Sequence, residues 1–446
     1  MRKSLAGLFI VFLVFVVAFS AMANGTSEKS TGGASGGVTQ LEFMVWDSTQ
    51  FQTYKQSIAE FEKSHPNIKV NAELYGWTQY WQKIQTTMAA GTPPDVFWNQ
   101  IQYFPTFLQN KTIEPLDSYI KKDNVDLTQF DPQLLKIFEY EGKIYTITKD
   151  WDTIALIYNK DVFDKLGIAY PDANLSWNPS DGGAFLSLAQ KLTIDKNGKN
   201  ATQAGFDSNS IVQWGTVSVN TNQPFYWNFM LMNGGGYQTA PWSNQFLYDN
   251  PKTAQAMQFL SDLIYKYHVA PQTSQLDATS QSIVQLLASG KVAMATDGSW
   301  DLRSIFENAN FKWGIAPLPS GPAGRISVIN GIGEAMSSSS QHKDQAWTLM
   351  KWFASEDNQK IFGSSGTVWP SRPALDPLFL NYWKTQGVDA TPFLDESRGK
   401  TALSAEALNW NQIYSIVNKY YSLLFTGSMD ATTAGQKIMG EIANIK

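Results

Sequence analysis

Residues 41–72 read LEFMVWDSTQFQTYKQSIAEFEKSHPNIKVNA, and this stretch decides the fold. The apolar run at 41–46 is typical of a β-strand, and the apolar residues between 51 and 63 recur at helical spacing. Pro66 ends that helix, and residues 68–72 again favour a strand. The stretch therefore predicts a strand–helix–strand unit.

The same pattern continues toward the C-terminus. A helix is predicted over 78–90, a Gly-Thr-Pro-Pro turn follows, and 95–98 is predicted as a third strand. Strands alternating with helices over short links indicate a parallel sheet with right-handed crossovers. Ligands of such sheets bind beyond the carboxyl ends of the strands. We therefore expect Trp46-Asp47-Ser48 and Trp98-Asn99-Gln100 to lie on one rim.

A second α/β unit is predicted after residue 147, and the chain is long enough to bury two cores. A strand at 153–159 leads into a helix at 161–166. Further helices are expected at 183–192, 226–232, 253–267, 281–289, 344–354 and 405–425, with short strands at 292–295 and 313–316.

The N-terminal residues are predicted to export the chain. A basic start, an apolar stretch over 5–19 and the small residues Ala21-Met22-Ala23 form a signal peptide with its cleavage site. We expect 1–23 to be removed near Ala23, 24–38 to form a flexible Gly/Ser-rich leader, and the protein to enter the periplasm. An uncleaved membrane anchor is the alternative, although a span usually needs ~20 apolar residues.

The composition excludes several classes of protein. Without residues 1–23 the chain has 32 basic and 39 acidic residues, a net charge of −7. That balance argues against a nucleic-acid partner, which requires clustered Lys and Arg. A cysteine count of 0 excludes disulfides, thiol catalysis and thiolate metal sites. It also excludes the lipid-accepting cysteine that follows the signal in many exported bacterial binding proteins.

Aromatic residues are unusually frequent. The 16 Trp, 18 Tyr and 26 Phe make up 13% of the chain. Aromatic side chains fill protein cores, but flat indoles also stack on the apolar faces of sugar rings while nearby polar groups bind the hydroxyls. Composition alone leaves both interpretations open.

Four blocks of sequence carry a resemblance to a known family. They are Ala90–Val96; Gly142–Tyr145 followed by Ala155–Phe163; Gly290–Trp300; and Pro317–Pro319 with Asn330–Gly333 and Ala346–Phe353. In this order and spacing they resemble the extracellular solute-binding proteins of bacterial ABC importers, the group that includes maltose-binding protein. The resemblance covers essentially all of the chain from Leu41 to Lys446.

The resemblance implies an α/β protein with the two-lobe periplasmic-binding-protein fold, type II-like, in which crossover hinge strands join two mixed sheets flanked by helices. We expect lobe 1 at 39–150 and 297–345, and lobe 2 at 151–296 and 346–446. It also implies a monomer without cofactors that closes on a sugar and delivers it to a membrane permease. Several stacking aromatics favour a sugar of two or more rings.

The resemblance further suggests individual ligand-binding residues. It implies stacking or contact by four tryptophans and hydrogen bonding by one carboxylate: Trp98, Trp227, Trp300, Trp410 and Asp152. Asp150 competes with Asp152 for the acceptor role. The rim adds Trp46, Asp47, Ser48 and Asn99 as candidates, and Trp46-Asp47-Ser48 departs from the loop of maltose-binding proteins, so the particular sugar stays open.

Three further polar residues have two interpretations each. Asp297 is either a turn former or a ligand acceptor. Arg372 either holds a ligand oxygen through its planar guanidinium or pairs with a surface acid. Asp95 lies between a proline and a buried strand, so we expect it to bind backbone amides rather than ligand.

Catalytic and metal-binding motifs do not stand out. The chain has no His-Glu-x-x-His sequence and no phosphate loop ending in Gly-Lys-Ser/Thr, and its 3 histidines are scattered. No enzymatic activity is expected. One alternative is a receptor for a phosphate ester, which needs several cations or amide donors, or for a polyamine, which needs converging carboxylates. A secreted glycoside hydrolase, with two carboxylates about 5–10 Å apart, is less favoured.

Overall fold

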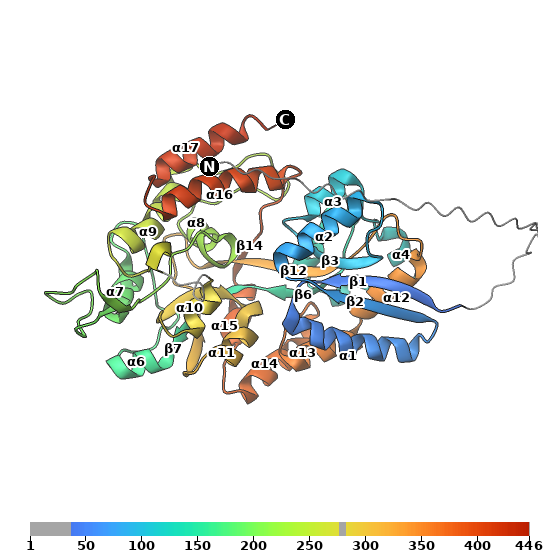
Figure 1. Cartoon of the computed structure of the whole chain (residues 1–446), viewed down its shortest axis with the longest axis horizontal. Coiled ribbons are helices and arrows are strands. Elements are labelled where there is room, and N and C mark those ends of the chain that lie inside the picture. Colours follow the sequence, from blue (N-terminus) through green and yellow to red (C-terminus); the bar gives the residue numbers. More distant parts are fainter. Residues whose placement is uncertain (1–36, 276–281, 446) are drawn as a thin grey trace, which may run out of the picture. The chain divides into compact units, whose positions relative to one another are not determined.

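Two β-sheets organise the chain (Figure 1). The structure is a computed structural model that describes residues 37–275 and 282–445. The predicted signal peptide and nearly all of the predicted leader lie outside the described residues. No helix in the described part of the chain is both long and apolar enough to cross a membrane.

The larger sheet has seven strands in the order β13-β6-β12-β3-β1-β2, with β14 also paired to β12. The predicted parallel arrangement is confirmed, because β1 pairs in parallel with both β2 and β3. The strands are β1 (Thr39–Val45), β2 (Ile68–Leu74), β3 (Val96–Gln100), β6 (Thr148–Asp152), β12 (Ile326–Met336), β13 (Trp369–Pro370) and β14 (Lys400–Leu403).

Helix α1 illustrates how burial of an apolar helix face stabilises this half of the protein. Tyr54, Ile58 and Phe61 follow at helical spacing and are all buried. Burying a side chain of this size stabilises the fold by roughly 1.5–3 kcal/mol. The helices of this half are α1 (Ser48–Ser64), α2 (Trp77–Ala89), α3 (Phe104–Asn110), α4 (Asp117–Lys122), α5 (Pro132–Leu135), α12 (Lys343–Phe353), α13 (Glu356–Ser365) and α14 (Asp376–Thr385), and β4 (Glu139–Tyr140) pairs with β5 (Lys143–Ile144).

The smaller sheet has three antiparallel strands in the order β10-β7-β11. Its central strand β7 is buried along its whole length, as expected for a strand covered on both faces. The elements are β7 (Ile154–Asn159), β10 (Met294–Gly298), β11 (Trp313–Ala316), α6 (Lys160–Leu166), α7 (Gly183–Leu192), the π-helix η3 (Asn222–Tyr226), α8 (Trp227–Met232), α9 (Pro251–Tyr265), α10 (Ile283–Ala288), α11 (Leu302–Asn308), α15 (Thr391–Arg398), α16 (Trp410–Phe425), α17 (Ala431–Ile442), and the short pair β8 (Ile194–Asp195) and β9 (Ile211–Gln213).

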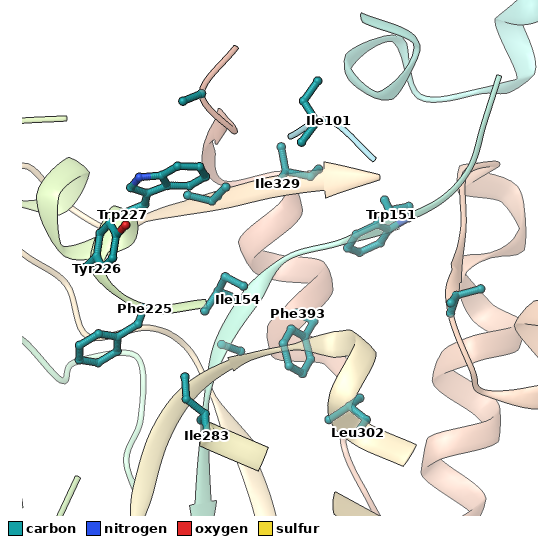
Figure 2. Packing of buried hydrophobic residues seen from close by; sticks show 14 of the residues in the cluster. Ile101, Trp151, Ile154, Phe225, Tyr226, Trp227, Ile283, Leu302, Ile329 and Phe393 are labelled. Atoms are coloured by element: carbon teal, nitrogen blue, oxygen red, sulfur yellow. The ribbon is translucent and has the colours of Figure 1, made fainter. Parts of the chain in front are cut away.

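At two crossings the chain passes directly from a strand of one sheet to a strand of the other, and it changes lobe again after α14. Strand β6 ends at Asp152 and β7 begins at Ile154, so Thr153 alone separates the larger sheet from the smaller. The second crossing runs from β11 into β12. Figure 2 shows buried Trp151, Ile154 and Ile329 beside these crossings, so apolar packing is continuous from one sheet to the other.

Strand pairing divides the chain differently from the boundaries expected from the sequence. β11 lies within the expected lobe 1 but pairs with β7 of the smaller sheet. Helix α12, placed mostly in the expected lobe 2, contacts β1 and β12, and β13 pairs with β6. The lobe boundaries remain a prediction. The strand pairing and contacts favour placing β11 in lobe 2, and α12 and β13 in lobe 1.

Helix α16 begins later than predicted. The helix expected from residue 405 starts at Trp410. Residues 404–407 are held outside it by polar contacts with another loop: Glu406 N donates to Gln238 Oε1 at 3.0 Å, and Trp242 N donates to the Glu406 carbonyl at 3.0 Å. Apolar periodicity cannot reveal such a tertiary contact.

Candidate ligand-binding site

The edge of the larger sheet beyond β1 is organised by a helix cap. Asp47 accepts hydrogen bonds from Thr49 N at 2.7 Å and Gln50 N at 2.9 Å, which is the bonding expected of an N-cap carboxylate. Ser48 is exposed. It lines an open hollow together with Thr49, Gln52, Thr53, Arg303, Glu307 and Thr367. The hollow therefore has one wall on α1 and another on α11.

Trp46 and Trp98 meet within an aromatic cluster at the same edge, with ring centroids 4.7 Å apart. Trp98 is completely buried, and its Nε1 donates to the Tyr54 hydroxyl at 2.9 Å. Neighbouring Asn99 is also fully buried and donates to Thr146 Oγ1 at 3.3 Å. Trp46 keeps part of its surface exposed, whereas Trp98 is bonded within the core of its own lobe.

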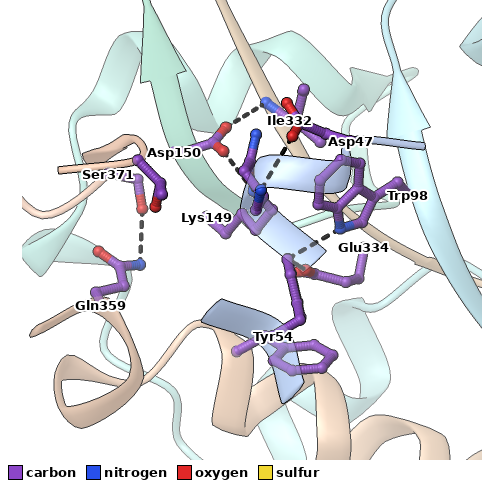
Figure 3. Close-up of polar contacts among 12 residues, drawn as sticks. Asp47, Tyr54, Trp98, Lys149, Asp150, Ile332, Glu334, Gln359 and Ser371 are labelled. Atoms are coloured by element: carbon purple, nitrogen blue, oxygen red, sulfur yellow. Dashed lines mark hydrogen bonds and ion pairs between the residues drawn. The ribbon is translucent and has the colours of Figure 1, made fainter. Parts of the chain in front are cut away.

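A buried polar network lies beneath this edge (Figure 3). The Tyr54 hydroxyl donates to Glu334 Oε1 at 2.5 Å. Lys149 Nζ donates to Gln50 Oε1 at 3.1 Å, forms an ion pair with Asp150, and lies 4.7 Å from the Trp98 ring centroid. Burial raises the pKa of Glu334 to about 7, although Lys149 opposes this effect. The network joins four separate segments of the larger-sheet lobe.

Asp150 connects the network to a small enclosed cavity. Its Oδ1 accepts from Ile332 N at 3.0 Å. The cavity of about 20 Å³ is lined by Gln50, Asp150, Trp151, Asp152, Ser299, Trp300, Ile332, Thr367 and Val368. A volume of this size holds about one water molecule. A sugar ring can enter here only if the walls move apart.

Asp152 lies where three segments meet. Its Oδ1 accepts from Gln223 Nε2 at 2.5 Å, and Gln223 Oε1 accepts from Asn330 Nδ2 at 3.4 Å. Burial raises the pKa of Asp152 well above its ordinary value, and the nearby Asp150 carboxylate adds to the shift. The three residues belong to β6, η3 and β12, so this contact joins the two crossings to the smaller-sheet lobe.

Asp297 and Trp300 come from β10 and the turn after it. Asp297 Oδ1 accepts from Gly298 N at 2.9 Å, while its Oδ2 has no hydrogen-bond partner among the described residues. Burial and the Asp301 carboxyl raise the pKa of Asp297. Trp300 packs so closely on Gly298 that an added Cβ would lie 2.1 Å from its ring. That close approach explains the glycine in the Asp297–Trp300 segment.

Trp227 and Trp410 lie together in the smaller-sheet lobe, with ring centroids 6.1 Å apart. Both are about 1% exposed, and the Nε1 of each has no hydrogen-bond partner among the described residues. Tyr237 packs on Trp227 at 4.5 Å. These indoles are packed like core residues, but they leave two buried donors unused.

Arg372 lies apart from the other candidates. Its guanidinium donates to the Ala354 carbonyl at 3.0 and 3.2 Å, bonds Gln129, and stacks over Phe130 at 4.5 Å. Its donors thus bind protein groups of the larger-sheet lobe. It does not line the cavity that Asp150 and Asp152 share.

Sequence reasoning missed several residues of this region. Gln223 and Asn330 bridge the crossings, Lys149 holds Asp150, and Glu406 lies beside Trp242. The polar segment Asn222-Gln223 just before the Trp227 helix was the available signal for Gln223. The expectation for Asp95 is confirmed, because its Oδ2 accepts from Glu42 N at 3.0 Å and its Oδ1 from Ser340.

Several buried polar atoms have no hydrogen-bond partner among the described residues, and three of them, Asn222 Nδ2, Asp297 Oδ2 and Asn330 Oδ1, lie on η3, β10 and β12 next to the crossings. In the described part of the chain they include Asn99 Oδ1, Asn222 Nδ2, Trp227 Nε1, Asp297 Oδ2, Asn330 Oδ1, Ser404 Oγ, both Glu406 carboxyl oxygens and Trp410 Nε1. Nearly all buried polar groups in proteins are paired, so such groups indicate water or a ligand. The described residues contain no cluster of His, Asp or Glu suited to a metal ion.

Two sheets joined by crossing strands, with aromatic and polar side chains gathered at the crossings, define a two-lobed solute-binding protein. The chain matches the family described as bacterial extracellular solute-binding protein over residues 46–360. It belongs to this family, whose members are exported binding proteins.

Individual relatives agree with that assignment. In structure the chain is similar to UspC of M. tuberculosis, with a TM-score of 0.72 and 28% identity, covering 90% of this chain and 99% of that one. It is also similar to an ABC substrate-binding protein of Listeria monocytogenes in complex with cycloalternan, at a TM-score of 0.78 and 23% identity, covering 91% and 98%. The arabinooligosaccharide-binding protein of Bacillus subtilis is 22% identical over 387 residues, which cover 84% of this chain and 82% of that protein. The two-lobe fold predicted from the sequence is confirmed.

Proposed function

We propose that this protein captures an extracellular oligosaccharide between its two lobes and delivers it to the permease of an ABC importer. The observation that carries the proposal is the group of buried, unpaired polar atoms at the crossings, which mixes donors with acceptors. A sugar offers hydroxyl groups that both donate and accept, so it can pair all of them. The names of the Bacillus and Listeria relatives support an oligosaccharide.

The charges of the site favour a neutral ligand over a phosphate ester. Lys149 is paired with Asp150. Arg303 donates to the Tyr382 hydroxyl at 2.6 Å and to the Ser365 carbonyl at 2.7 Å. Both cations are therefore engaged by the protein, and a phosphate that bound to them would have to break these contacts.

The carboxyl groups disfavour a polyamine. Burial raises the pKa of Asp152 and of Asp297, so both resist ionisation. Attraction of a polycation requires ionised carboxylates. A neutral sugar can instead donate hydroxyl protons to these groups or accept theirs.

Binding is expected to close the lobes about the two crossings. The chain segments at Asp150–Thr153, Asp297 and Asn330 serve as hinges, and a sugar that contacts both lobes stabilises the closed state by its differential affinity. X-ray scattering should show a smaller radius of gyration with sugar than without. An equal radius at saturation would contradict hinge closure.

The remaining features of the proposal concern location and turnover. Release at Ala23 would place the protein in the periplasm as a monomer, and mass measurement of the mature chain tests the cleavage. No reaction is expected on the bound sugar. Chromatography of each oligosaccharide after long incubation tests this, and cleavage that depends on one carboxylate would favour the hydrolase.

The deciding experiment is calorimetry of the purified protein against maltotriose, arabinotriose, raffinose, glucose 6-phosphate and spermidine. We expect saturable binding of at least one neutral oligosaccharide and none of the charged compounds. Binding of spermidine or the phosphate ester alone would overturn the proposed ligand class.

A further inference from the structure

Glu406 is held in place by backbone contacts on both sides. Its N donates to Gln238 Oε1 at 3.0 Å, and its carbonyl accepts from Gln238 Nε2 at 2.7 Å and from Trp242 N at 3.0 Å. The residue is 1% exposed. Its side chain therefore has a fixed origin in the interior.

Neither carboxyl oxygen of Glu406 accepts a well-formed hydrogen bond among the described residues, although the Trp242 indole lies close enough to interact with the carboxyl. Burying a polar group in this way costs several kcal/mol on the scale of transfer to an apolar medium. Burial raises the pKa of Glu406 to about 9, and the Trp242 indole opposes the shift only in part. A plain structural role does not explain a fixed, buried acid that is so weakly hydrogen-bonded.

Three neighbours share the same property. Ser404 Oγ, Trp227 Nε1 and Trp410 Nε1 are also buried without a partner in the described structure. Trp410 and Trp227 face each other, and Tyr237 contacts Trp227 while lying close enough to Glu406 for its pKa to rise. We call Trp227, Ser404, Glu406 and Trp410 the Glu406 patch. It combines two indole donors, a hydroxyl and a carboxyl.

The patch lies beside a contact between the lobes. Trp242, which bonds the Glu406 backbone, packs on Phe104 at 5.8 Å and on Tyr140 at 4.7 Å, both in the larger-sheet half. Gln109 of α3 also donates to Asn409 at 2.9 Å. Opening the lobes would separate these contacts and uncover the patch.

The groups that face Glu406 determine how it can bind a ligand. From the 237–242 loop they are the Tyr237 phenol, the Gln238 amide and the Trp242 indole, and α16 begins four residues after Glu406, at Trp410. None of these carries a positive charge, and the pKa of Tyr237 is itself raised. A neutral sugar adds no cation, so nothing in this pocket compensates an ionised carboxylate.

We propose that the Glu406 patch is a second sugar subsite, in which Glu406 binds the ligand as a neutral carboxylic acid that donates one hydrogen bond and accepts another. This inference rests on the proposed function. The alternative is that Glu406 binds the sugar as an ionised carboxylate. The two protonation states predict different changes of sugar affinity with pH. Protonated acids are known to donate hydrogen bonds in apolar sites of this kind.

The test measures the affinity of wild type, Glu406→Gln and Glu406→Leu for the tightest-binding of maltotriose, arabinotriose and raffinose. Glu406→Leu should lose at least 30-fold at pH 7, since it can neither donate nor accept. Glu406→Gln should lose about threefold to tenfold, because an amide keeps both functions but donates more weakly. Between pH 8 and pH 10 wild-type affinity should fall about tenfold, and that of Glu406→Gln should not fall.

The matched control is Glu396→Gln. Glu396 is also buried, but it accepts from Leu318 N at 2.9 Å and lies 3.5 Å from Arg325. This control should bind like wild type. Thermal melts check folding, and if Glu406→Leu does not fold, the pH profile of Glu406→Gln still decides.

Several results would overturn the inference. If Glu406→Leu bound sugar as tightly as wild type, the Glu406 patch would be part of the hydrophobic core and not a sugar subsite. Equal losses in both variants at pH 7, with proton release on binding, would mean that Glu406 acts as a carboxylate. Failure of wild type to bind any of the sugars would instead reject the proposed function itself.

Discussion

Two buried tryptophans, Trp98 of the larger-sheet lobe and Trp227 of the smaller-sheet lobe, differ in whether the indole N–H is hydrogen-bonded. In the larger-sheet lobe, Trp98 Nε1 bonds Tyr54, which bonds Glu334, and Lys149 pairs with Asp150. In the smaller-sheet lobe, Trp227 Nε1 has no partner in the described structure. Buried donors are rarely left unpaired. The comparison indicates that Trp98 is committed to its own lobe, whereas the donor of Trp227 is free for a ligand; Trp81 Nε1 of the larger-sheet lobe is also without a partner among the described residues.

The largest expected effect is on the paired region. Lys149→Met leaves Asp150 as a buried, uncompensated acid, which should destabilise the protein by about 3–5 kcal/mol. Urea unfolding measures the loss. Lys63→Met is the control, since Lys63 is 69% exposed beside Glu60 and a surface pair is worth about 0–1 kcal/mol. Equal stability of the two variants would contradict a structural role for the network.

A second prediction contrasts two acids. Asp152→Ala should weaken sugar binding about 10- to 100-fold, as expected for loss of a hydrogen bond to a charged or polar acceptor. Asp195 is the matched residue: it is buried but accepts from Asn197 N at 2.8 Å and Lys199 N at 2.9 Å. Asp195→Ala should lower the melting temperature and leave sugar affinity unchanged. Calorimetry and thermal melts separate the two effects.

The pH dependence of stability sharpens the comparison further. The pKa of Glu334 is raised to about 7, so the folded protein binds this proton more tightly than the unfolded chain does. Stability should therefore fall as pH rises from about 4.5, the range where an unfolded Glu ionises, to about 7. Glu334→Gln should remove part of this slope in urea unfolding. An unchanged slope would show that Glu334 is ionised in the folded protein.

The sequence predicted the alternation of strands and helices well, because apolar periodicity reports directly on burial. It predicted β1, α1, β2, α2 and β3 in order, and their parallel pairing is confirmed. It could not distinguish Trp98 from Trp227 as a paired and an unpaired indole, because local sequence does not show which side chains meet in the fold. Only tertiary contacts, such as the Tyr54 hydroxyl beside Trp98, reveal which indole is already paired.

Other parts of the site depended on contacts between distant segments. Gln223 reaches Asp152 across 71 positions of sequence, and Gln238 reaches Glu406 across 168. No local pattern encodes these meetings. Glu406 even lies in a segment that periodicity predicted to be helical, so neither its exposure nor its role could be inferred from the sequence.

The claim that Trp227 is kept unpaired for a ligand, whereas Trp98 stabilises its lobe, is tested most directly by comparing Trp98→Phe with Trp227→Phe. Each substitution keeps an aromatic ring and removes one Nε1 donor. Trp98→Phe breaks the bond to Tyr54 and should cost about 1 kcal/mol of stability without changing sugar affinity. Trp227→Phe removes an unpaired donor, so it should weaken sugar binding severalfold while stability holds or rises slightly. Urea unfolding should therefore show a loss of stability for Trp98→Phe only. Calorimetry should show a loss of sugar affinity for Trp227→Phe only. If Trp227→Phe loses stability and keeps its affinity, the unpaired region is core and the account is wrong.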